Sequence, residues 1–557
     1  MTFDSLTDGP RAYLVLALLA LALYAPGIDV FPVTDRDEAR IAQATRQMVE
    51  SGDYINIRFQ DSPRNKKPAG IHWLQAGAVL GPGGGDTALI WPYRLPSALG
   101  AMAAVLALFA LARPAFCSQV AFLGAVILGS AILTVVEAHI AKTDAFLLFS
   151  VIVAQGALMG IYRSGRAGAR ASPARAMVFW GALGTAILIK GPVLPFIVAL
   201  TLAALAIADR RAGIRANLWA GLRPLPGLAL AAAIAAPWFI AVTLGGSDFV
   251  FGAVTEDLLP KLLGAQESHG GPPGTYLALA PITFWPGVLL LPFGLIWAWR
   301  NRRDPGPRFC LAWLIPAWLA FELIPTKLAH YVLPLYPAAA LLAASAAVDG
   351  RDWLAAALDR WPARAWLALW CLAGLALAAL VPAAAYFASG AIPPLAWAPA
   401  AAAGLVLVAG VAGHISRDTR LMALGPAPAM ILFLGLTFAA ALPAIPELWP
   451  SAGVRALVQA QRPLGGAPVA AAGFHEPSLV FALGTETLLT QAGDAARHLA
   501  QRPGALALIE ARREAKFRAA LRRLGLTAVA LGTVRGVNVA KVKAVSLTLY
   551  RAGPARP

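Results

Sequence analysis

The stretches TDRDEAR, at Thr34 to Arg40, and NKKPAGIHWL, at Asn65 to Leu74, lie in one loop between the first two apolar segments of the chain. Charged residues make up only 13% of the sequence and hydrophobic residues 59%, so a loop this polar needs a reason. Carboxylates and ammonium groups held together at a membrane surface suit chemistry on a phosphate-linked lipid. The loop therefore predicts both a membrane-embedded fold and the place of its functional site.

The apolar segments predict a mainly helical, polytopic membrane protein. Runs of about twenty apolar residues are long enough to cross a bilayer, and they recur along most of the chain. The first run, Ala12 to Tyr24, has no convincing cleavage site, so we interpret it as a membrane helix rather than a signal peptide. Thirteen spans are predicted, near 12–28, 92–112, 118–136, 144–162, 177–189, 192–208, 226–244, 277–299, 309–324, 331–347, 365–387, 394–413 and 421–441.

Arginine-rich connections set the expected orientation. The segments 163–175, 209–223, 299–308 and 416–420 are rich in arginine and all fall on one side of the predicted spans. The positive-inside rule places that side in the cytoplasm, so the first loop lies on the outer side of the membrane. The net charge of +17 is then explained by arginine set against anionic membrane lipid, and no nucleic-acid partner is expected.

The composition changes near the end of the last predicted span. We expect a transmembrane domain over 1–442, whose external first loop covers 28–91, and a small α/β domain on the outer face over 443–557. Within that second domain, 467–474 and 505–509 have the pattern of buried strands.

A basic helix is predicted over 512–524, with Phe517, Leu521 and Leu524 on its apolar face. A solvated basic face is favoured over a lipid contact, although anionic lipid would attract such a helix.

The three cysteines match no metal or redox spacing and are interpreted as small apolar residues; they are Cys117, Cys310 and Cys371.

Acidic residues follow the first predicted span. Asp37 and Glu38 precede apolar residues at helical spacing, so a short interfacial helix is expected to begin there. The helix dipole would stabilise the charge of Asp37 at this helix start and keep it ionised. A helix cap with a salt bridge to Arg36 or Arg40 is the structural alternative. We predict Asp37 and Glu38 as catalytic residues.

Asp144 stands at the external start of another predicted helix, in the stretch AKTDAF. It could simply cap that helix. The same short link also contains Glu137, His139 and Lys142, and polar groups at membrane depth usually mark a site or a pathway. Asp144 is therefore predicted as a second catalytic carboxylate.

Three lysines stand at the external ends of predicted spans: Lys67, Lys190 and Lys327. Lysine side chains at the ends of membrane helices commonly extend to the membrane surface. This structural role is the alternative explanation for each of the three. Three on one face, each beside proline or in a tight turn, are better explained by an anionic ligand such as a lipid phosphate. His269 and His330 lie in the same external loops and complete the predicted cavity.

A transporter or lipid flippase is the alternative class. Transporters often consist of two related halves with interrupted helices at matching positions, and no such repeat is visible in this sequence. The polar residues also gather on one face instead of at the middle of the membrane.

In the C-terminal domain, His475 and Glu476 precede Pro477, which favours the start of a helix over a catalytic role.

The ordered motifs of the chain resemble a known family. DEAR, KKPAGIHWL, TDAFLLF, IKGP, ESHGGPPGTYL, KLAHYVLPLYP and GFHEPSLVF are similar to segments of the GT-C glycosyltransferases of the protein O-mannosyltransferase superfamily. The aminoarabinose lipid A transferase type is the most similar. Each motif is short, but their order covers almost the whole chain.

This resemblance implies a GT-C fold in a bacterial inner membrane, with a catalytic domain of thirteen membrane helices, interfacial helices in the periplasmic first loop and a periplasmic α/β domain. It implies transfer of a sugar from a polyprenyl phosphate donor to a lipid A-like lipid or another periplasmic acceptor. Matched residue by residue, Asp37 takes the position that faces the reacting sugar and Asp144 that of a second acidic residue. Lys67 takes the position that meets the carrier phosphate, with Tyr331 as its companion, and Lys190 that of the lysine in the KGP turn.

The chain departs from the family pattern at two places. It has Lys66-Lys67-Pro68 where the aminoarabinose enzymes carry Glu-Lys-Pro, and His269 is followed by glycine instead of arginine. A carboxylate–histidine metal site, a possibility in that family, loses its carboxylate here, and Lys66 offers a replacement positive charge. No cofactor and no metal-binding residues are therefore expected, while the sequence leaves open whether a divalent cation assists the reaction. The expected reaction is a single displacement with inversion, in which lysines stabilise the leaving phosphate and Asp37 accepts a proton or orients the sugar.

Overall fold

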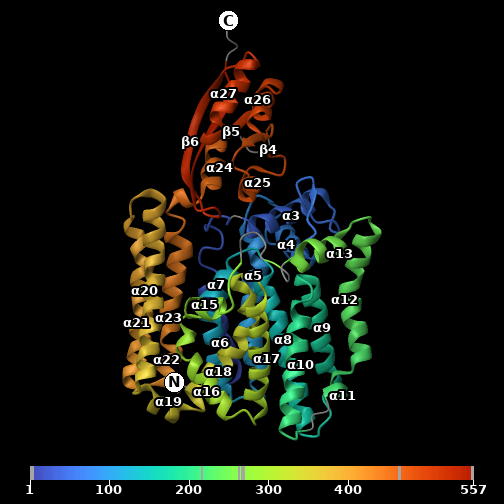
Figure 1. Cartoon of the computed structure of the whole chain (residues 1–557), viewed down its shortest axis with the longest axis vertical. Coiled ribbons are helices and arrows are strands. Elements are labelled where there is room, and N and C mark those ends of the chain that lie inside the picture. Colours follow the sequence, from blue (N-terminus) through green and yellow to red (C-terminus); the bar gives the residue numbers. More distant parts are fainter. Residues whose placement is uncertain are drawn as a thin grey trace.

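The computed structural model of the chain describes residues 6–34, 36–214, 218–260, 264, 270–461 and 466–553, leaving aside the side chains of 256–258. A bundle of helices carries a smaller part with a β-sheet at one of its ends (Figure 1). Helices α3 (Asp37–Ser51) and α4 (Gly70–Leu80) of the first loop lie where the two parts meet. We call this end of the bundle, at Asp144, the domain face, and the other end, at Arg166, the opposite face.

The helix bundle has the character of a multi-pass membrane protein. Within the described residues, eight helices are long and apolar enough to cross a membrane, or nine if one bent pair counts as a span. They are α5 (Trp91–Ala112), α8 (Asp144–Arg166), α10 (Val193–Arg211), α12 (Pro224–Leu244), η3 with α18 (Ala329–Val348), α20 (Trp361–Ser389), η4 with α21 (Pro394–Ser416) and α22 to η5 (Thr419–Ala441).

The predicted number of thirteen spans is not confirmed. Every predicted segment coincides with a helix or a broken helix, but the remaining ones fall short in length or in apolar content. These are α2 (Gly9–Tyr24), α9 (Pro173–Lys190), α15 (Thr275–Thr283), α16 (Leu291–Arg300) and α17 (Pro305–Leu323).

One predicted span is bent inside the bundle. Helices α6 (Ser118–Ser130) and α7 (Ile132–Ala138) meet at 62°. The Ile132 N–H at the break donates to the Trp285 carbonyl at 3.0 Å. Non-helical backbone at membrane depth is tolerated where protein supplies such hydrogen bonds. Because of the bend, the short helix α7 can present Glu137 to the link that precedes α8.

Helices α5 and α8 approach each other closely because Gly100 has no side chain. A Cβ atom at this position would lie 2.9 Å from the Cα atom of Phe146, which a packed interior does not accommodate. Near this contact, the Ser97 hydroxyl donates to the carbonyl of Lys142 at 3.1 Å. The link 139–143 is thereby fixed against α5, immediately before Asp144.

The C-terminal part is built on a five-stranded sheet in the order β4-β3-β5-β7-β6. Strand β3 pairs in parallel with β4 and β5, whereas β7 pairs antiparallel with β5 and β6. Apolar cores lie on both faces of the sheet. The elements are α24 (Pro450–Gln461), β3 (Val469–Ala472), α25 (Pro477–Leu483), β4 (Leu488–Thr490), α26 (Ala492–Gln501), β5 (Leu506–Glu510), α27 (Glu514–Arg523), β6 (Ala528–Asn538) and β7 (Lys543–Ala552).

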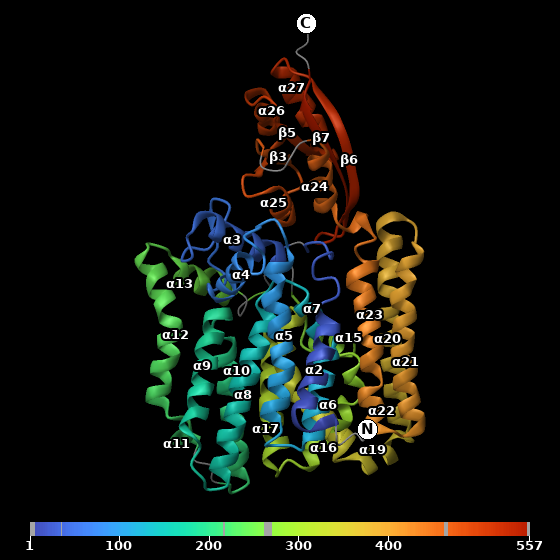
Figure 2. The ribbon, with the colours of Figure 1, turned by 180° about the vertical axis from the view of Figure 1, so that it is seen from behind.

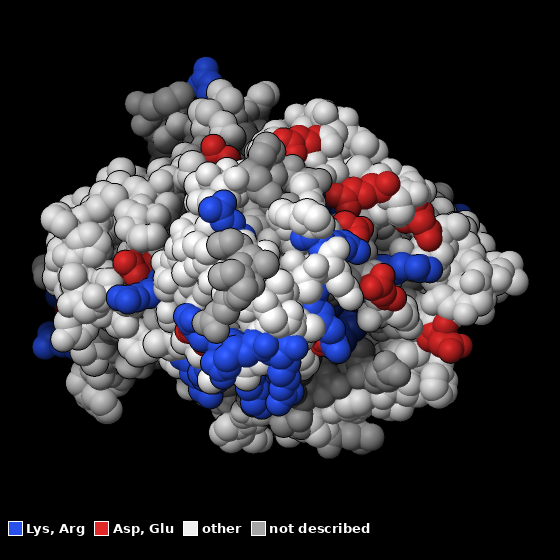
Figure 3. Space-filling model, turned by 90° about the horizontal axis from the view of Figure 1, so that it is seen from above, with Lys and Arg blue, Asp and Glu red and all other residues white. Residues whose placement is uncertain are grey.

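The two predicted strands and the predicted basic helix are confirmed as β3, β5 and α27. Phe517 and Leu521 are buried as expected, but Leu524 is exposed because the helix ends before it. Helix α27 lies at the end of the C-terminal part that points away from the bundle (Figures 1 and 2). Seen from that end, lysine and arginine side chains gather on one part of the surface (Figure 3). This placement favours a solvated basic face over a contact with the membrane that the bundle crosses.

The C-terminal part rests on the first loop through α25. The Phe481 ring packs edge-on against Tyr93 with ring centroids 5.5 Å apart, and the Phe481 carbonyl accepts a hydrogen bond from Arg46 at 3.0 Å. A second contact joins Gln43 of α3 to the Thr485 hydroxyl at 2.8 Å. The middle of α3 and the start of α5 are therefore both in contact with the sheet-containing part.

Candidate active site

Helix α3 begins at Asp37, as predicted, but its second residue is directed into the protein. The Glu38 carboxylate pairs with Arg94 of α5 at 2.7 Å, and both side chains are fully buried. Glu38 also accepts hydrogen bonds from the Thr34 N–H at 2.7 Å and the Ala141 N–H at 3.0 Å. The geometry corrects the predicted catalytic role: Glu38 is a positioning residue that ties α3 to α5 and to the link before Asp144.

Arg94 completes this junction, which we call the Glu38–Arg94 clamp. Its guanidinium donates to the carbonyls of Ile28 at 3.1 Å, Phe31 at 2.6 Å and Pro32 at 3.1 Å. Burial alone would raise the pKa of Glu38, but Arg94 and the N–H donors hold that pKa below its usual value. Most of the hydrogen-bonding atoms of this charged pair therefore have a partner. A buried ion pair is stable in a protein only when this condition is met.

Lys142 is the centre of a second polar cluster at the domain face. Its Nζ atom lies 3.2 Å from Glu137 Oε1, 4.0 Å from Asp144 Oδ2 and 3.4 Å from His330 Nδ1. Burial would lower the pKa of Lys142, but the Glu137 and Asp144 carboxylates raise it above its usual value. Lys142 is thus a charged bridge between α7, α8 and η3, although the sequence indicated it only as a neighbour of Asp144.

Glu137 is the second residue that sequence reasoning did not include in the site. Its Oε1 atom contacts Lys142, whereas its buried Oε2 atom has no hydrogen-bond partner within the described part of the chain. Buried polar atoms without a partner are rare and need an explanation, such as a ligand or a functional role. The bend between α6 and α7 places Glu137 here, and such a bend has no clear signal in the sequence.

Asp144 forms an ion pair with Lys190, the last residue of α9, and both side chains are buried. The Nζ atom of Lys190 lies 5.8 Å from the ring centroid of Tyr331. Thr143 occupies the cap position of α8, and no side-chain hydrogen bond caps this helix. The structure therefore joins three predicted residues, and the carboxylate of Asp144 faces other charged side chains rather than its own helix end.

Asp37 is exposed at the start of α3 but lies within the electrostatic field of this cluster. The surrounding protein alone would raise its pKa. Lys142, His330 and Lys67 together lower that pKa below the usual value of an aspartate. Asp37 is thus an ionised carboxylate, accessible from outside and surrounded by basic groups from three other segments.

Helix α4 brings the Lys67 loop to this place. Gly70, at the start of α4, packs so tightly on the end of α9 that a Cβ atom there would lie 2.6 Å from the Leu188 carbonyl oxygen. The contact lies two residues before Lys190. At this position only glycine lets the two backbones touch, which keeps the loop of Lys67 close to the Asp144–Lys190 pair.

Three other predicted residues are placed differently. Lys327 donates to the carbonyls of Phe321 at 3.0 Å and Glu322 at 2.6 Å, so it caps the end of α17 and its ammonium is already engaged. This geometry corrects the prediction that Lys327 binds the carrier phosphate. Lys66 is exposed, and His269 lies outside the described residues. His330, in contrast, is part of the Lys142 cluster.

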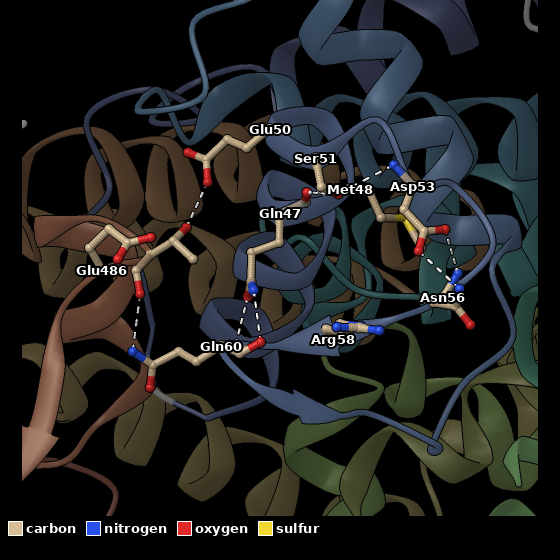
Figure 4. Close-up of a pocket in the computed structure, with 10 residues that line it drawn as sticks. Gln47, Met48, Glu50, Ser51, Asp53, Asn56, Arg58, Gln60 and Glu486 are labelled. Carbon is tan, nitrogen blue, oxygen red and sulfur yellow. Dashed lines mark hydrogen bonds between the residues drawn. The ribbon is translucent and has the colours of Figure 1, made fainter. Parts of the chain in front are cut away.

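A polar hollow of about 390 Å³ lies on the other side of α3, where it meets the C-terminal part. Side chains of α3 and the following loop face Glu486 across it (Figure 4). Glu50 accepts a hydrogen bond from the Thr485 hydroxyl at 2.7 Å in its wall. The predicted site residues do not line this hollow. Among the described residues, no three His, Cys, Asp or Glu side chains converge in the manner of a metal site.

Comparison with known proteins defines the class. Residues 66–240 match the family described as dolichyl-phosphate-mannose-protein mannosyltransferase. The fold is that of ArnT from Cupriavidus metallidurans bound to undecaprenyl phosphate, with a TM-score of 0.73, 19% identity and coverage of 97% of this chain and 98% of that one. The chain is a membrane glycosyltransferase with the GT-C fold.

Within this class the chain is similar to the ArnT type. The undecaprenyl phosphate-α-4-amino-4-deoxy-L-arabinose arabinosyl transferase of Aeromonas salmonicida is 29% identical over 434 residues, which is 76% of each chain. The protein of the same name from Aeromonas hydrophila is 28% identical over 435 residues, again 76% of each. The resemblance expected from the ordered motifs is confirmed, and the comparisons give no support to the transporter alternative.

Proposed function

We propose that this chain transfers a sugar from a polyprenyl phosphate carrier to a lipid A-like acceptor at the domain face, and that this face is periplasmic. One observation carries the proposal: Asp37, Asp144, Lys142 and Lys190 come from distant segments and converge with His330 at one end of the bundle. The names of the relatives support the donor class. The arginine-rich connections at the opposite face support the orientation.

The charge balance of the cluster suits a phosphodiester donor. The cationic side chains of the cluster outnumber its carboxylates, so positive charge is available to meet the negative charge of the donor phosphate. The cations are Lys142, Lys190, Lys67 and Arg64, and the carboxylates are Asp37, Glu137 and Asp144. As the leaving group gains a second negative charge, fixed ammonium groups stabilise the transition state more than the ground state.

The proposed reaction is a single displacement at the anomeric carbon of the donor sugar. An acceptor oxygen forms a bond to this carbon, and the bond from carbon to the phosphate oxygen breaks with its electron pair left on the phosphate. If the acceptor is a hydroxyl group, its proton passes to the Asp37 carboxylate. If it is a phosphate, no proton has to be removed and Asp37 orients the sugar. Attack opposite to the leaving phosphate inverts the configuration.

Asp144 has a different task in this scheme. Its carboxylate is engaged with Lys190 and lies close to Lys142, so it holds both ammonium groups in place instead of taking a proton. Tyr331 limits the movement of Lys190 from the other side. The two lysines therefore meet the phosphate in a preorganised position, which spares the enzyme reorganisation energy during the reaction.

The test uses purified protein with undecaprenyl-phosphate-linked aminoarabinose and lipid A, and measures the glycosylated lipid. Asp37→Asn is expected to lower the rate by about 10²- to 10⁴-fold if a hydroxyl is the acceptor, and Lys67→Met to raise KM for the donor. Asp61→Asn, an exposed carboxylate in the same loop, is the matched control and retains full activity. Unchanged turnover in a folded Asp37→Asn variant would refute the proposed site.

A further inference from the structure

A hollow of about 820 Å³ lies at the opposite face of the bundle, far from the candidate active site. The ends of α5 and α8 and the start of α9 form its walls. Helix α8 has 23 residues, and at 1.5 Å per residue it separates the hollow from Asp144 by roughly 30 Å. The hollow therefore cannot belong to the reaction centre at the domain face.

The polar end of this hollow is basic. Arg163, Arg166 and Arg175 all line it and are half-buried, and its described lining contains no Asp or Glu. Three guanidinium groups around one hollow repel one another unless an anion lies between them. A charge arrangement of this kind is complementary to a phosphate group.

Arg175 is held in place by the neighbouring helix. Gly160 of α8 leaves room for it, since a Cβ atom there would lie 2.8 Å from the Arg175 Cδ atom. The guanidinium donates to the Gly160 carbonyl at 3.3 Å and to the Ser164 hydroxyl at 3.4 Å. Arg166 is fixed in a similar way, because it donates to the Arg303 carbonyl at 2.9 Å. The basic end is therefore preorganised rather than formed by loose surface side chains.

The rest of the hollow is apolar and reaches into the membrane-spanning part of the helices. Leu111 of α5, Met159 of α8 and Val178 of α9 contribute to this wall. A ligand that fills both ends needs an anionic head and a hydrocarbon tail. Free phosphate or a soluble phosphorylated metabolite would leave the apolar wall without a partner.

We propose that this hollow binds one anionic phospholipid, with its phosphate among Arg163, Arg166 and Arg175 and an acyl chain along the apolar wall. Basic pockets between membrane helices bind acidic lipid headgroups in this manner. The bound lipid would neutralise the three guanidinium groups and fill the gap between α5, α8 and α9. The site is separate from the carrier-binding site and does not depend on the proposed reaction.

The full-length protein is purified and placed in nanodiscs that contain phosphatidylethanolamine with a small fraction of phosphatidylglycerol, and retained lipid is measured by native mass spectrometry. Wild type is expected to retain one phosphatidylglycerol. The double variant Arg163→Gln/Arg175→Gln is expected to bind it about tenfold or more weakly. Arg210→Gln/Arg211→Gln, two exposed arginines at the same face, is the matched control and keeps the lipid.

Three outcomes would overturn the inference. Equal retention by wild type and the Arg163/Arg175 variant would show that the hollow does not hold the lipid. Equal loss in the control variant would show that general surface charge retains it. Release of the lipid by millimolar inorganic phosphate would assign the site to a soluble anion. Thermal unfolding of each variant, measured beside the lipid signal, confirms that the protein is folded.

Discussion

The Glu38–Arg94 clamp gives the most quantitative prediction. The substitution Glu38→Gln keeps the size of the side chain but removes its charge, and Arg94 then remains buried beside neutral groups only. Both side chains are fully buried in the native protein. Removing one partner of a buried ion pair typically costs about 3–5 kcal/mol. Because Arg94 still has three carbonyl partners, we expect a loss near the lower end, about 3 kcal/mol.

The assay is unfolding of the reconstituted protein by increasing mole fractions of a denaturing detergent. Glu50→Gln serves as the matched control, since Glu50 lies on the same helix and forms a more exposed pair with Arg46 at 2.6 Å. That pair is expected to contribute only about 0.2–1 kcal/mol. If Glu38→Gln destabilises the protein no more than Glu50→Gln, the clamp does not organise the first loop and the reasoning is wrong.

The pH dependence of the clamp has a defined sign. Because the folded-state pKa of Glu38 lies below its usual value, the stabilisation is present at neutral pH and is lost as the pH falls through that lower value. Wild type is therefore expected to lose stability on acidification more steeply than Glu38→Gln. Parallel pH profiles of the two proteins would contradict this.

Three further predictions concern the site. Lys190→Met removes the partner of Asp144 and is expected to lower kcat/KM for the donor by about 10- to 100-fold, because this is the effect of losing one charged hydrogen bond. Unchanged donor kinetics would exclude Lys190 from phosphate binding. The pKa of Asp37 is lowered, so its carboxylate stays ionised and kcat/KM should stay level as the pH falls toward about 4, the usual aspartate value. A loss of activity already near pH 6 would contradict the proposed role of Asp37. Lys327→Met should destabilise the end of α17 by about 1–3 kcal/mol without changing KM for the donor, whereas a raised KM would return Lys327 to the site.

Much of the site was predictable because charged residues are costly in an apolar chain. Asp37, Asp144 and Lys190 stand out in the sequence since each interrupts a hydrophobic context, and the structure gathers them at one face. The same rule failed for Glu38 and Lys327, because the cost of burial can also be met by a structural partner. Sequence alone does not distinguish a carboxylate that meets Arg94 from one that meets a substrate.

The central role of Lys142 and Glu137 could not be predicted for a geometric reason. Their positions depend on the bend between α6 and α7, and this bend is stabilised by the Trp285 carbonyl, which lies about 150 residues later in the chain. The predicted number of spans is not confirmed for a related reason, since a broken helix has the same composition as a straight one. Hydropathy measures how apolar a segment is and does not report where its backbone bends.

The dependence of Glu137 and Lys142 on later segments has a consequence for biogenesis. During synthesis these two residues leave the ribosome long before His330, which contacts both of them in the finished protein. A nascent chain halted before that point holds an incomplete polar cluster at the edge of the lipid. Such intermediates are natural substrates for membrane insertases and quality-control proteases, so truncated chains should be degraded rapidly even though most of their helices are already inserted.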